Sequence, residues 1–199
     1  MNLADYIDEK FKANPEFQHI QVYYFSDCGW NLMDWGCYGD ECTGEVSNTK
    51  ALYRAHKPLL NEHCWDYNYT WLCYWPEMFY SFIEAKDRLM VTQQMYDSQQ
   101  LPWAGKKAPS AWDEGQTEWA MMRADAILDS MADQGVTNAF VSSCRNHDYS
   151  EHQCVYSTLV DGKSLAEYIN DFIESGGSKR FYAIDEDRHP EANPTCEAV

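Results

Sequence analysis

The sequence predicts an α+β fold in which a mixed or antiparallel sheet of about four to five strands packs against amphipathic helices. Two observations support this class. Helical and strand-like segments are interspersed without a repeated strand–helix–strand unit. The chain of 199 residues is 45% hydrophobic and 15% aromatic, which is enough to build a buried core. We expect a single domain over residues 1–199, and a Pro- and Gly-containing loop at residues 99–115 is where two lobes would separate.

The first predicted elements are a helix, a strand and a long loop. Leu3, Ile7 and Phe11 recur at helical spacing and predict a helix over residues 3–12. Residues 19–26 are rich in β-branched and aromatic side chains and predict a strand. Four glycines within residues 28–44 predict the loop that follows.

The middle of the chain predicts two helices around an aromatic strand. Residues 47–60 form a weak helical pattern that Pro58 interrupts. Residues 67–75 (YNYTWLCYW) are typical of a strand. Pro76 suits the first turn of a helix, which we expect to continue to about residue 98.

The last part predicts helices with well-marked ends. A helix over residues 116–134 is closed by a glycine, and a Ser-x-x-Glu capping box at Ser164 and Glu167 opens another helix that ends near residue 175. Strand-like residues fill the segments between and after these helices. The predicted strands span residues 136–144, 153–160 and 179–185.

The charge of the chain restricts its partners. It carries 32 Asp and Glu against 15 Lys and Arg, for a formal net charge of −17. Such a surface repels the phosphates of nucleic acids and anionic lipid headgroups, so we expect neither direct nucleic-acid binding nor membrane binding. The expected partner is a basic protein.

The location of the chain is predicted from its first residues and its apolar runs. No secretory signal is visible at the start, and no apolar run is long enough to span a membrane. We therefore expect a cytoplasmic protein whose eight cysteines are chiefly free thiols.

The acidic residues gather on the outer faces of three predicted helices. On a helical projection they oppose the apolar side of each helix, and few basic residues lie between them. Trp119 and Met122 project toward the same side as the acids, where they could anchor a protein contact. The predicted partner-binding residues are Asp5, Asp8, Glu9, Glu118, Trp119, Met122, Asp125, Asp129, Asp133, Glu167, Asp171 and Glu174.

Small size, acidity and the absence of catalytic motifs make the chain similar in composition to DNA-mimic inhibitors that phages and plasmids use against restriction or CRISPR systems. This resemblance implies a non-enzymatic inhibitor that occupies the nucleic-acid-binding surface of a partner protein, in the host cytoplasm if it is phage-encoded. An immunity protein or antitoxin that neutralises a basic nuclease is an alternative in the same class. A structural component of a larger assembly is a third.

A zinc-dependent enzyme or zinc-stabilised domain is the alternative from another class. Cys144, His147, His152 and Cys154 supply two thiolates and two imidazoles, the ligands of tetrahedral zinc, and Asp148 or Glu151 could act as acid and base. The leading hypothesis expects no cofactor, and zinc is the one cofactor that this alternative would add. A second cluster around Cys28, Cys37 and Cys42, followed by His63 and Cys64, lacks the short paired spacing of zinc ribbons.

Other catalytic patterns are weak. Cys64 beside His63 and Cys144 near His147 are candidate thiol–imidazole pairs, but spacing alone does not show that they meet. Asp185, Glu186 and Asp187 could bind a divalent cation or supply paired carboxylates, but three acids in a row are most simply a solvated surface. The sequence contains neither a phosphate-binding glycine loop nor a Gly-x-Ser-x-Gly turn.

Overall fold

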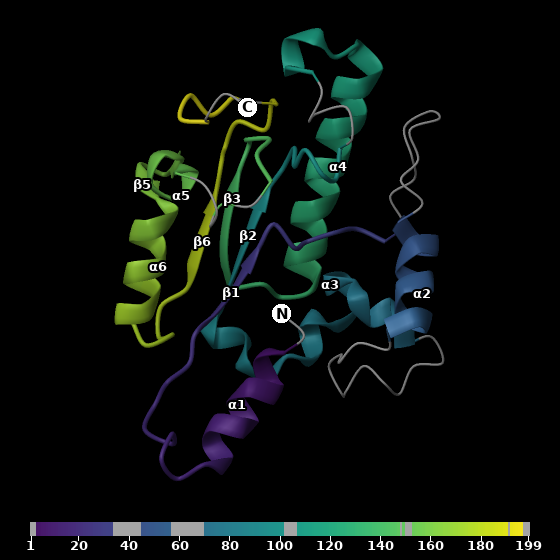
Figure 1. The fold of residues 1–199 in the computed structure, drawn as a ribbon. Coiled ribbons are helices and arrows are strands. Elements are labelled where there is room, and N and C mark those ends of the chain that lie inside the picture. Colours follow the sequence, from purple (N-terminus) through teal and green to yellow (C-terminus); the bar gives the residue numbers. More distant parts are fainter. Residues whose placement is uncertain are drawn as a thin grey trace.

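The centre of the protein is a four-stranded parallel sheet (Figure 1). The computed structural model describes residues 3–33, 45–56, 70–101, 107–147, 149, 153–190 and 192–196. All three strand pairs of the sheet are parallel. Its strands, in spatial order, are β1 (Tyr24–Asp27), β2 (Leu89–Gln94), β3 (Asn138–Ser142) and β6 (Phe181–Ile184).

The predicted mixed or antiparallel sheet is therefore wrong, and the physical reason lies in the burial of the central strands. Every residue of β2 and β3 is buried, as expected for parallel strands that helices cover on both faces. Within the described residues, antiparallel pairing is confined to a small second sheet of β4 (Leu159–Val160) and β5 (Lys163–Ser164).

Helices lie on both faces of the parallel sheet, so the molecule is layered helix, sheet, helix (Figure 1). The long helix α4 (Glu114–Asp133) belongs to the core on one face, and α6 (Leu165–Glu174) packs its Phe172 on the other, with Phe140 of β3. The residues predicted to form the buried side of α4 are all buried: Ala120, Ala124, Ile127, Leu128 and Met131.

The remaining described helices are short or peripheral. None of the helices in the described part of the chain is both long and apolar enough to cross a membrane. The α-helices are α1 (Ala4–Ala13), α2 (Glu45–His56), α3 (Pro76–Phe79) and α5 (Cys154–Ser157), and the 3-10 helices are Thr70–Tyr74, Tyr80–Phe82, Glu84–Arg88 and Pro109–Ala111.

Four of the predicted helices are confirmed, as α1, α2, α4 and α6. The capping box is confirmed as well, because the backbone N–H of Ser164 donates to Glu167 Oε2 at 2.8 Å while the N–H of Glu167 donates to Ser164 Oγ. The helix predicted over residues 76–98 is wrong. The structure instead has short helical turns that lead into β2. The prediction failed because a buried apolar run fits the pattern of a helix and of a strand equally well.

Two of the predicted strands are also wrong in part. Residues 70–74 of the aromatic segment form a 3-10 helix, and residues 154–157 form α5 before the short strand β4. In both places aromatic and β-branched residues pack as well on a helical turn as on a strand, so the tertiary contacts decide.

Asp8 joins α1 to the 3-10 helix that precedes β2, through an ion pair with Arg88. Its carboxylate lies 2.7 Å from Arg88 Nη1 and 2.6 Å from Lys12 Nζ, and its side chain is 10% exposed. The hydrogen bond from Arg88 is the largest cause that holds the pKa of Asp8 below its usual value of 3.8, against the opposing effect of burial.

This lowered pKa gives a testable dependence of stability on pH. A carboxyl whose pKa is lower in the folded state adds stability above its unfolded pKa, near 4, and that stability is lost as the pH falls through the folded value. We expect Asp8→Asn to lower the free energy of unfolding at pH 7 by about 1–3 kcal/mol and to flatten its decline below pH 4, measured by urea unfolding.

The matched control is Glu9→Gln, which neutralises an exposed carboxylate on the next residue of α1. It should change the free energy of unfolding by less than about 0.5 kcal/mol. The role assigned to Asp8 would be contradicted if the free energy of unfolding declined below pH 4 in the same way in Asp8→Asn and in the unmodified chain.

Candidate functional site: a thiol, an imidazole and a carboxylate

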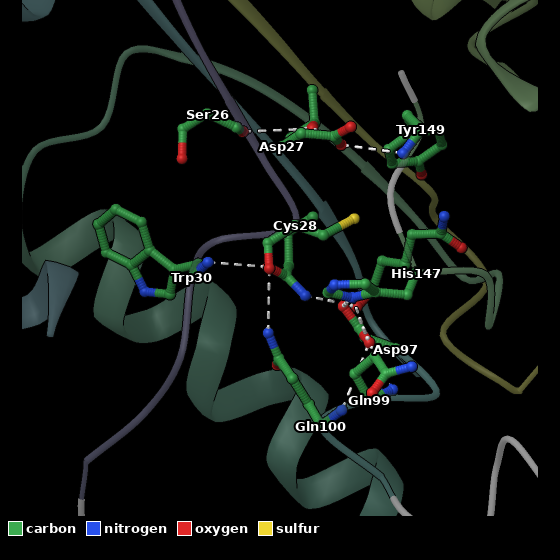
Figure 2. Close-up of polar contacts among 12 residues, drawn as sticks. Ser26, Asp27, Cys28, Trp30, Asp97, Gln99, Gln100, His147 and Tyr149 are labelled. Atoms are coloured by element: carbon green, nitrogen blue, oxygen red, sulfur yellow. Dashed lines mark hydrogen bonds and ion pairs between the residues drawn. The ribbon is translucent and has the colours of Figure 1, made fainter. Parts of the chain in front are cut away.

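Three side chains meet beyond the carboxyl ends of three neighbouring parallel strands. Cys28 follows β1, Asp97 follows β2 and His147 follows β3. The thiol sulfur, a carboxylate oxygen and a ring nitrogen all lie within 4.8 Å of one another (Figure 2). The carboxyl edge of a parallel sheet is where α/β proteins place their ligands, because the loops that leave the strands converge there.

Cys28 sits on a strained turn. Its φ of 47° lies in the left-handed region, which costs a non-glycine residue roughly 1–2 kcal/mol. Successive side chains of a strand point to opposite faces of the sheet, and continuing this alternation from β1 would place the side chain of Cys28 on the α4 face. Instead it packs on the α6 face, in the cluster of Phe140 and Tyr149. In Figure 2 the sulfur lies on the side of His147 and Tyr149, away from Trp30. Backbone strain of this kind is common at functional sites.

Hydrogen bonds hold the backbone of the turn on both sides of Cys28. The N–H of Cys28 donates to the carbonyl of Thr92 at 3.0 Å, and its own carbonyl accepts from Gln100 Nε2 at 3.3 Å. Two residues later the buried Trp30 donates its N–H to Gln93 Oε1 at 3.0 Å and its indole N–H to Ser130 Oγ at 3.2 Å. The backbone around the thiol is therefore held in one conformation.

Asp97 is completely buried, and backbone donors fix its carboxylate. Oδ1 accepts the N–H of Gln99 at 2.8 Å and that of Gln100 at 3.3 Å, an arrangement typical of aspartates in turns. The same turn is joined to the loop after β3, because the N–H of Ser98 donates to the carbonyl of Arg145 at 2.9 Å. The carboxylate thus stays next to His147.

His147 connects the carboxylate to solvent. Its Nδ1 lies 2.8 Å from Asp97 Oδ2 and 3.0 Å from Oδ1, and its side chain is 33% exposed. An Asp carboxylate accepts and does not donate, so this contact places a proton on Nδ1. In the neutral ring the lone pair is then on Nε2, the nitrogen that a general base needs.

Asp27 ties the loop of His147 to the strand of Cys28. Its Oδ1 accepts the N–H of Tyr149 at 3.0 Å and the hydroxyl of Thr92 at 2.9 Å. Because Asp27 directly precedes Cys28 and Tyr149 lies two residues after His147, this contact sets the thiol and the imidazole relative to each other.

The zinc cluster predicted from the sequence does not form as predicted. Cys144 is in a disulfide with Cys196, so its sulfur is not a thiolate ligand, and His147 contacts Asp97 instead. His152, Asp148, Glu151 and the side chain of Cys154 lie outside the described residues. The expectation of free thiols is wrong for Cys144, Cys196 and Cys73, which are all disulfide-bonded, whereas Cys28 carries a thiol.

Several of the predicted partner-binding acids make contacts inside the molecule. Asp5 accepts the N–H groups of Glu84 and Ala85, Asp125 pairs with Arg188, and Asp171 lies 2.8 Å from Lys163. Asp8 binds Arg88 and Glu167 caps its own helix, as described above. The side chains of Glu9, Glu118, Asp129, Asp133 and Glu174 are exposed.

The two predicted aromatic and thioether anchors differ in exposure. Met122 is 56% exposed, whereas Trp119 is half-buried and packs against the core. Neither residue, nor any of the predicted acids, belongs to the group of Cys28, Asp97 and His147.

Sequence reasoning missed two of the three site residues. Cys28 stood within a weak cysteine cluster, and Asp97 lay inside a segment predicted as helix. The usable signal was position, because each of the three residues closely follows a strand of the sheet. That signal requires the strands to be parallel and adjacent, which the pattern did not show.

A groove elsewhere does not include these residues. It measures about 460 Å³, and Leu32, Met33, Met78, Asp129 and Asp133 are among the residues that line it. It therefore belongs to the surface of α4, not to the site of Cys28.

Comparison with known proteins identifies the fold. The sequence matches no protein-family model and no curated protein. The structure is similar to two crystal forms of the Wnt deacylase Notum from Drosophila, with TM-scores of 0.83 and 0.81 at 21% and 22% identity. The matches cover 99% and 98% of this chain and 54% and 55% of those chains, so this chain spans about half their length.

This likeness overturns the function predicted from composition. A DNA-mimic inhibitor of the anti-restriction or anti-CRISPR type, or an immunity protein or antitoxin, is contradicted by a fold shared with the solved structures of a deacylase. The acidity was real, but net charge reports on solubility and association and does not specify a fold. The chain has the fold of these deacylase structures over nearly all of its length.

Proposed function

We propose that the protein hydrolyses an acyl bond of the ester or thioester class, with Cys28 as nucleophile, His147 as general base and Asp97 as the residue that orients the imidazole. One observation carries this proposal. The imidazole of His147 is held by a buried carboxylate on one side while the thiol of Cys28 lies within 4.8 Å, at the ends of three adjacent strands. A nucleophile, a base and a group that orients the base form the arrangement that covalent acyl transfer requires.

The reaction follows from the donors and acceptors of these groups. His147 takes the thiol proton as Sγ of Cys28 attacks the acyl carbon, and the same proton then passes to the leaving alcohol or thiol. The acyl group is now a thioester on Cys28. A water molecule, deprotonated by His147, attacks this thioester, which releases the carboxylic acid and returns the proton to the thiol.

The turn at Cys28 also offers a donor for the oxyanion. In strained nucleophile turns the N–H of the residue after the nucleophile supplies one such donor. Here that residue is Gly29, whose N–H donates to no atom of the described residues. A backbone donor fixed in advance stabilises the developing negative charge without reorganisation.

Two further facts bear on the proposal. The neighbouring solved structures are of a protein named a deacylase. The second concerns the choice of nucleophile: these 199 residues contain no Gly-x-Ser-x-Gly turn, so within them we assign the nucleophile to the thiol of Cys28.

The proposal is tested by trapping the acyl group. The full chain is incubated with p-nitrophenyl acetate, butyrate and octanoate, and intact-mass and peptide mass spectrometry locate the adduct. We expect one acyl group per chain on Cys28, formed in a burst of p-nitrophenol.

The variant Cys28→Ala should give neither the adduct nor the burst, while Asp129→Asn, a change on the exposed face of α4, should give both. Acylation of another residue in the unmodified chain, or the same burst in Cys28→Ala, would show that Cys28 is not the nucleophile. Circular dichroism of each variant confirms that it is folded.

The disulfide between Cys144 and Cys196 bears on where this chemistry takes place. Disulfides persist in oxidising compartments and are rare in the cytosol. The proposal therefore includes an oxidising compartment in place of the cytoplasm expected from the sequence. Non-reducing peptide mapping of the protein from its native source would test this, because a fully reduced pair would contradict it.

A further inference from the structure

We propose that Cys28, Asp97 and His147 also form a binding site for Zn²⁺, and that bound zinc blocks acyl transfer at Cys28. The second half of this statement rests on the proposed function, whereas the first half does not. The site differs from the cluster predicted in the sequence, with which it shares His147.

The first argument is the chemistry of the donors. A thiolate, an imidazole and a carboxylate are the three side-chain types that ligate zinc, and zinc sites with an open position use three protein ligands. Softer ligands such as thiolate and imidazole favour zinc over magnesium and calcium, which prefer oxygen. The donor set of Cys28, His147 and Asp97 therefore selects a zinc-like ion.

The second argument is distance. With Zn–S near 2.3 Å and Zn–N or Zn–O near 2.1 Å, tetrahedral geometry places donors roughly 3.3–3.6 Å apart. The three donor atoms are already within 4.8 Å of one another. Nδ1 of His147 is 2.8 Å from Asp97 Oδ2, and His147 would release the proton of this hydrogen bond for Nδ1 to ligate the ion. To reach one ion, Nδ1 and Oδ2 would separate by about 0.5–0.8 Å and a pair at the 4.8 Å limit would approach by about 1 Å, shifts within reach of side-chain rotation.

The third argument is preorganisation. Asp97 receives two backbone N–H groups, and the loop of His147 is joined to β1 through Asp27. Outer contacts of this kind orient ligands and strengthen metal binding. The ligands thus need little ordering when the ion binds, and the one ligand with notable exposure, His147, gives the ion its approach.

Zinc bound in this way would stop the proposed reaction. A lone pair of Cys28 and a lone pair of His147 would both be engaged by the metal, so the thiol could not attack and the ring could not accept a proton. Removal of the ion would restore both groups without any change of the fold.

The binding experiment uses the full chain under non-reducing conditions, so that disulfide sulfurs cannot act as ligands. Zinc is titrated in competition with a chromophoric chelator, and Co²⁺ is added separately as a spectroscopic probe. We expect one zinc per chain, with affinity lowered at least about 100-fold in Cys28→Ser and in His147→Ala. The cobalt form should show a thiolate charge-transfer band.

The control variant is His189→Ala, which removes a histidine of the C-terminal segment and should leave zinc affinity unchanged. A cobalt spectrum of the unmodified chain without a thiolate band would overturn the site even if a variant failed to fold. So would zinc affinity that stays the same in Cys28→Ser.

The acyl-trapping assay then separates the two proposals. Adduct formation that zinc abolishes and a chelator restores supports both. An adduct at Cys28 without zinc binding overturns the zinc site and leaves the hydrolytic function standing. Zinc binding that depends on Cys28 and His147, with no adduct in the metal-free chain, overturns the hydrolytic function and leaves a metal site.

Discussion

Replacing Asp97 by Asn is expected to lower kcat for ester hydrolysis about 10³–10⁴-fold while KM changes little. The amide oxygen of Asn can still accept the N–H groups of Gln99 and Gln100, so the turn is preserved. Its NH₂ group, however, would face Nδ1 of His147 and donate to it. The proton of the ring would then move to Nε2, and the imidazole could no longer accept the proton of Cys28.

The measurement is steady-state hydrolysis of p-nitrophenyl butyrate, with kcat and KM determined separately. A merely structural role for Asp97 would lower the thermal midpoint and the fraction of active enzyme, but it would not give a folded protein with normal KM and almost no turnover. Asp97→Glu, which keeps the carboxylate, should recover part of kcat. A loss of less than about tenfold in a folded Asp97→Asn protein would contradict the orienting role.

Loss of the Cys144–Cys196 disulfide is expected to have the largest effect on stability. The bond joins positions 52 residues apart, and closing a loop of that size in the unfolded chain corresponds to about 4 kcal/mol in the chain-entropy account, with typical values of 2–4 kcal/mol. The double variant Cys144→Ala, Cys196→Ala should lose this amount in urea unfolding. Alanine is chosen because Cys144 is buried.

The folded state of the double variant should remain close to that of the unmodified chain. Asn193 holds the C-terminal segment by other means, since its Nδ2 donates to both carboxylate oxygens of Asp185 and its N–H donates to Ser143 Oγ. The loss of stability should therefore come from the greater conformational freedom of the unfolded chain. The comparison variant is Cys28→Ala, which removes a buried thiol without opening a disulfide. A double variant no less stable than Cys28→Ala would refute the expectation.

Local patterns in the sequence were sufficient for α1, α4 and α6. The buried residues of α4 recur at helical spacing, and the capping box at Ser164 satisfies helix donors through residues three positions apart. Both signals act over one or two helical turns, so they can be read without the tertiary structure.

The net charge of the chain was given correctly by the sequence, but the function inferred from that charge was wrong. The sequence showed acids on helix faces, but it could not show that Asp8 meets Arg88 or that Asp125 meets Arg188, because these partners come from distant segments. Some of the apparently uncompensated acids therefore stabilise the fold itself. An acidic helix face is weak evidence for a basic partner when its long-range ion pairs are unknown.

The sequence by itself determined the amphipathic helices, the presence of a large core and His147 as a residue of interest. The tertiary structure alone decided that the strands are parallel, that Cys144 pairs with Cys196, and that Cys28 and Asp97 join His147. The reason is physical. Helix periodicity and capping are local interactions, whereas strand order, disulfide pairing and a site built at the ends of three strands depend on contacts between residues far apart in the chain.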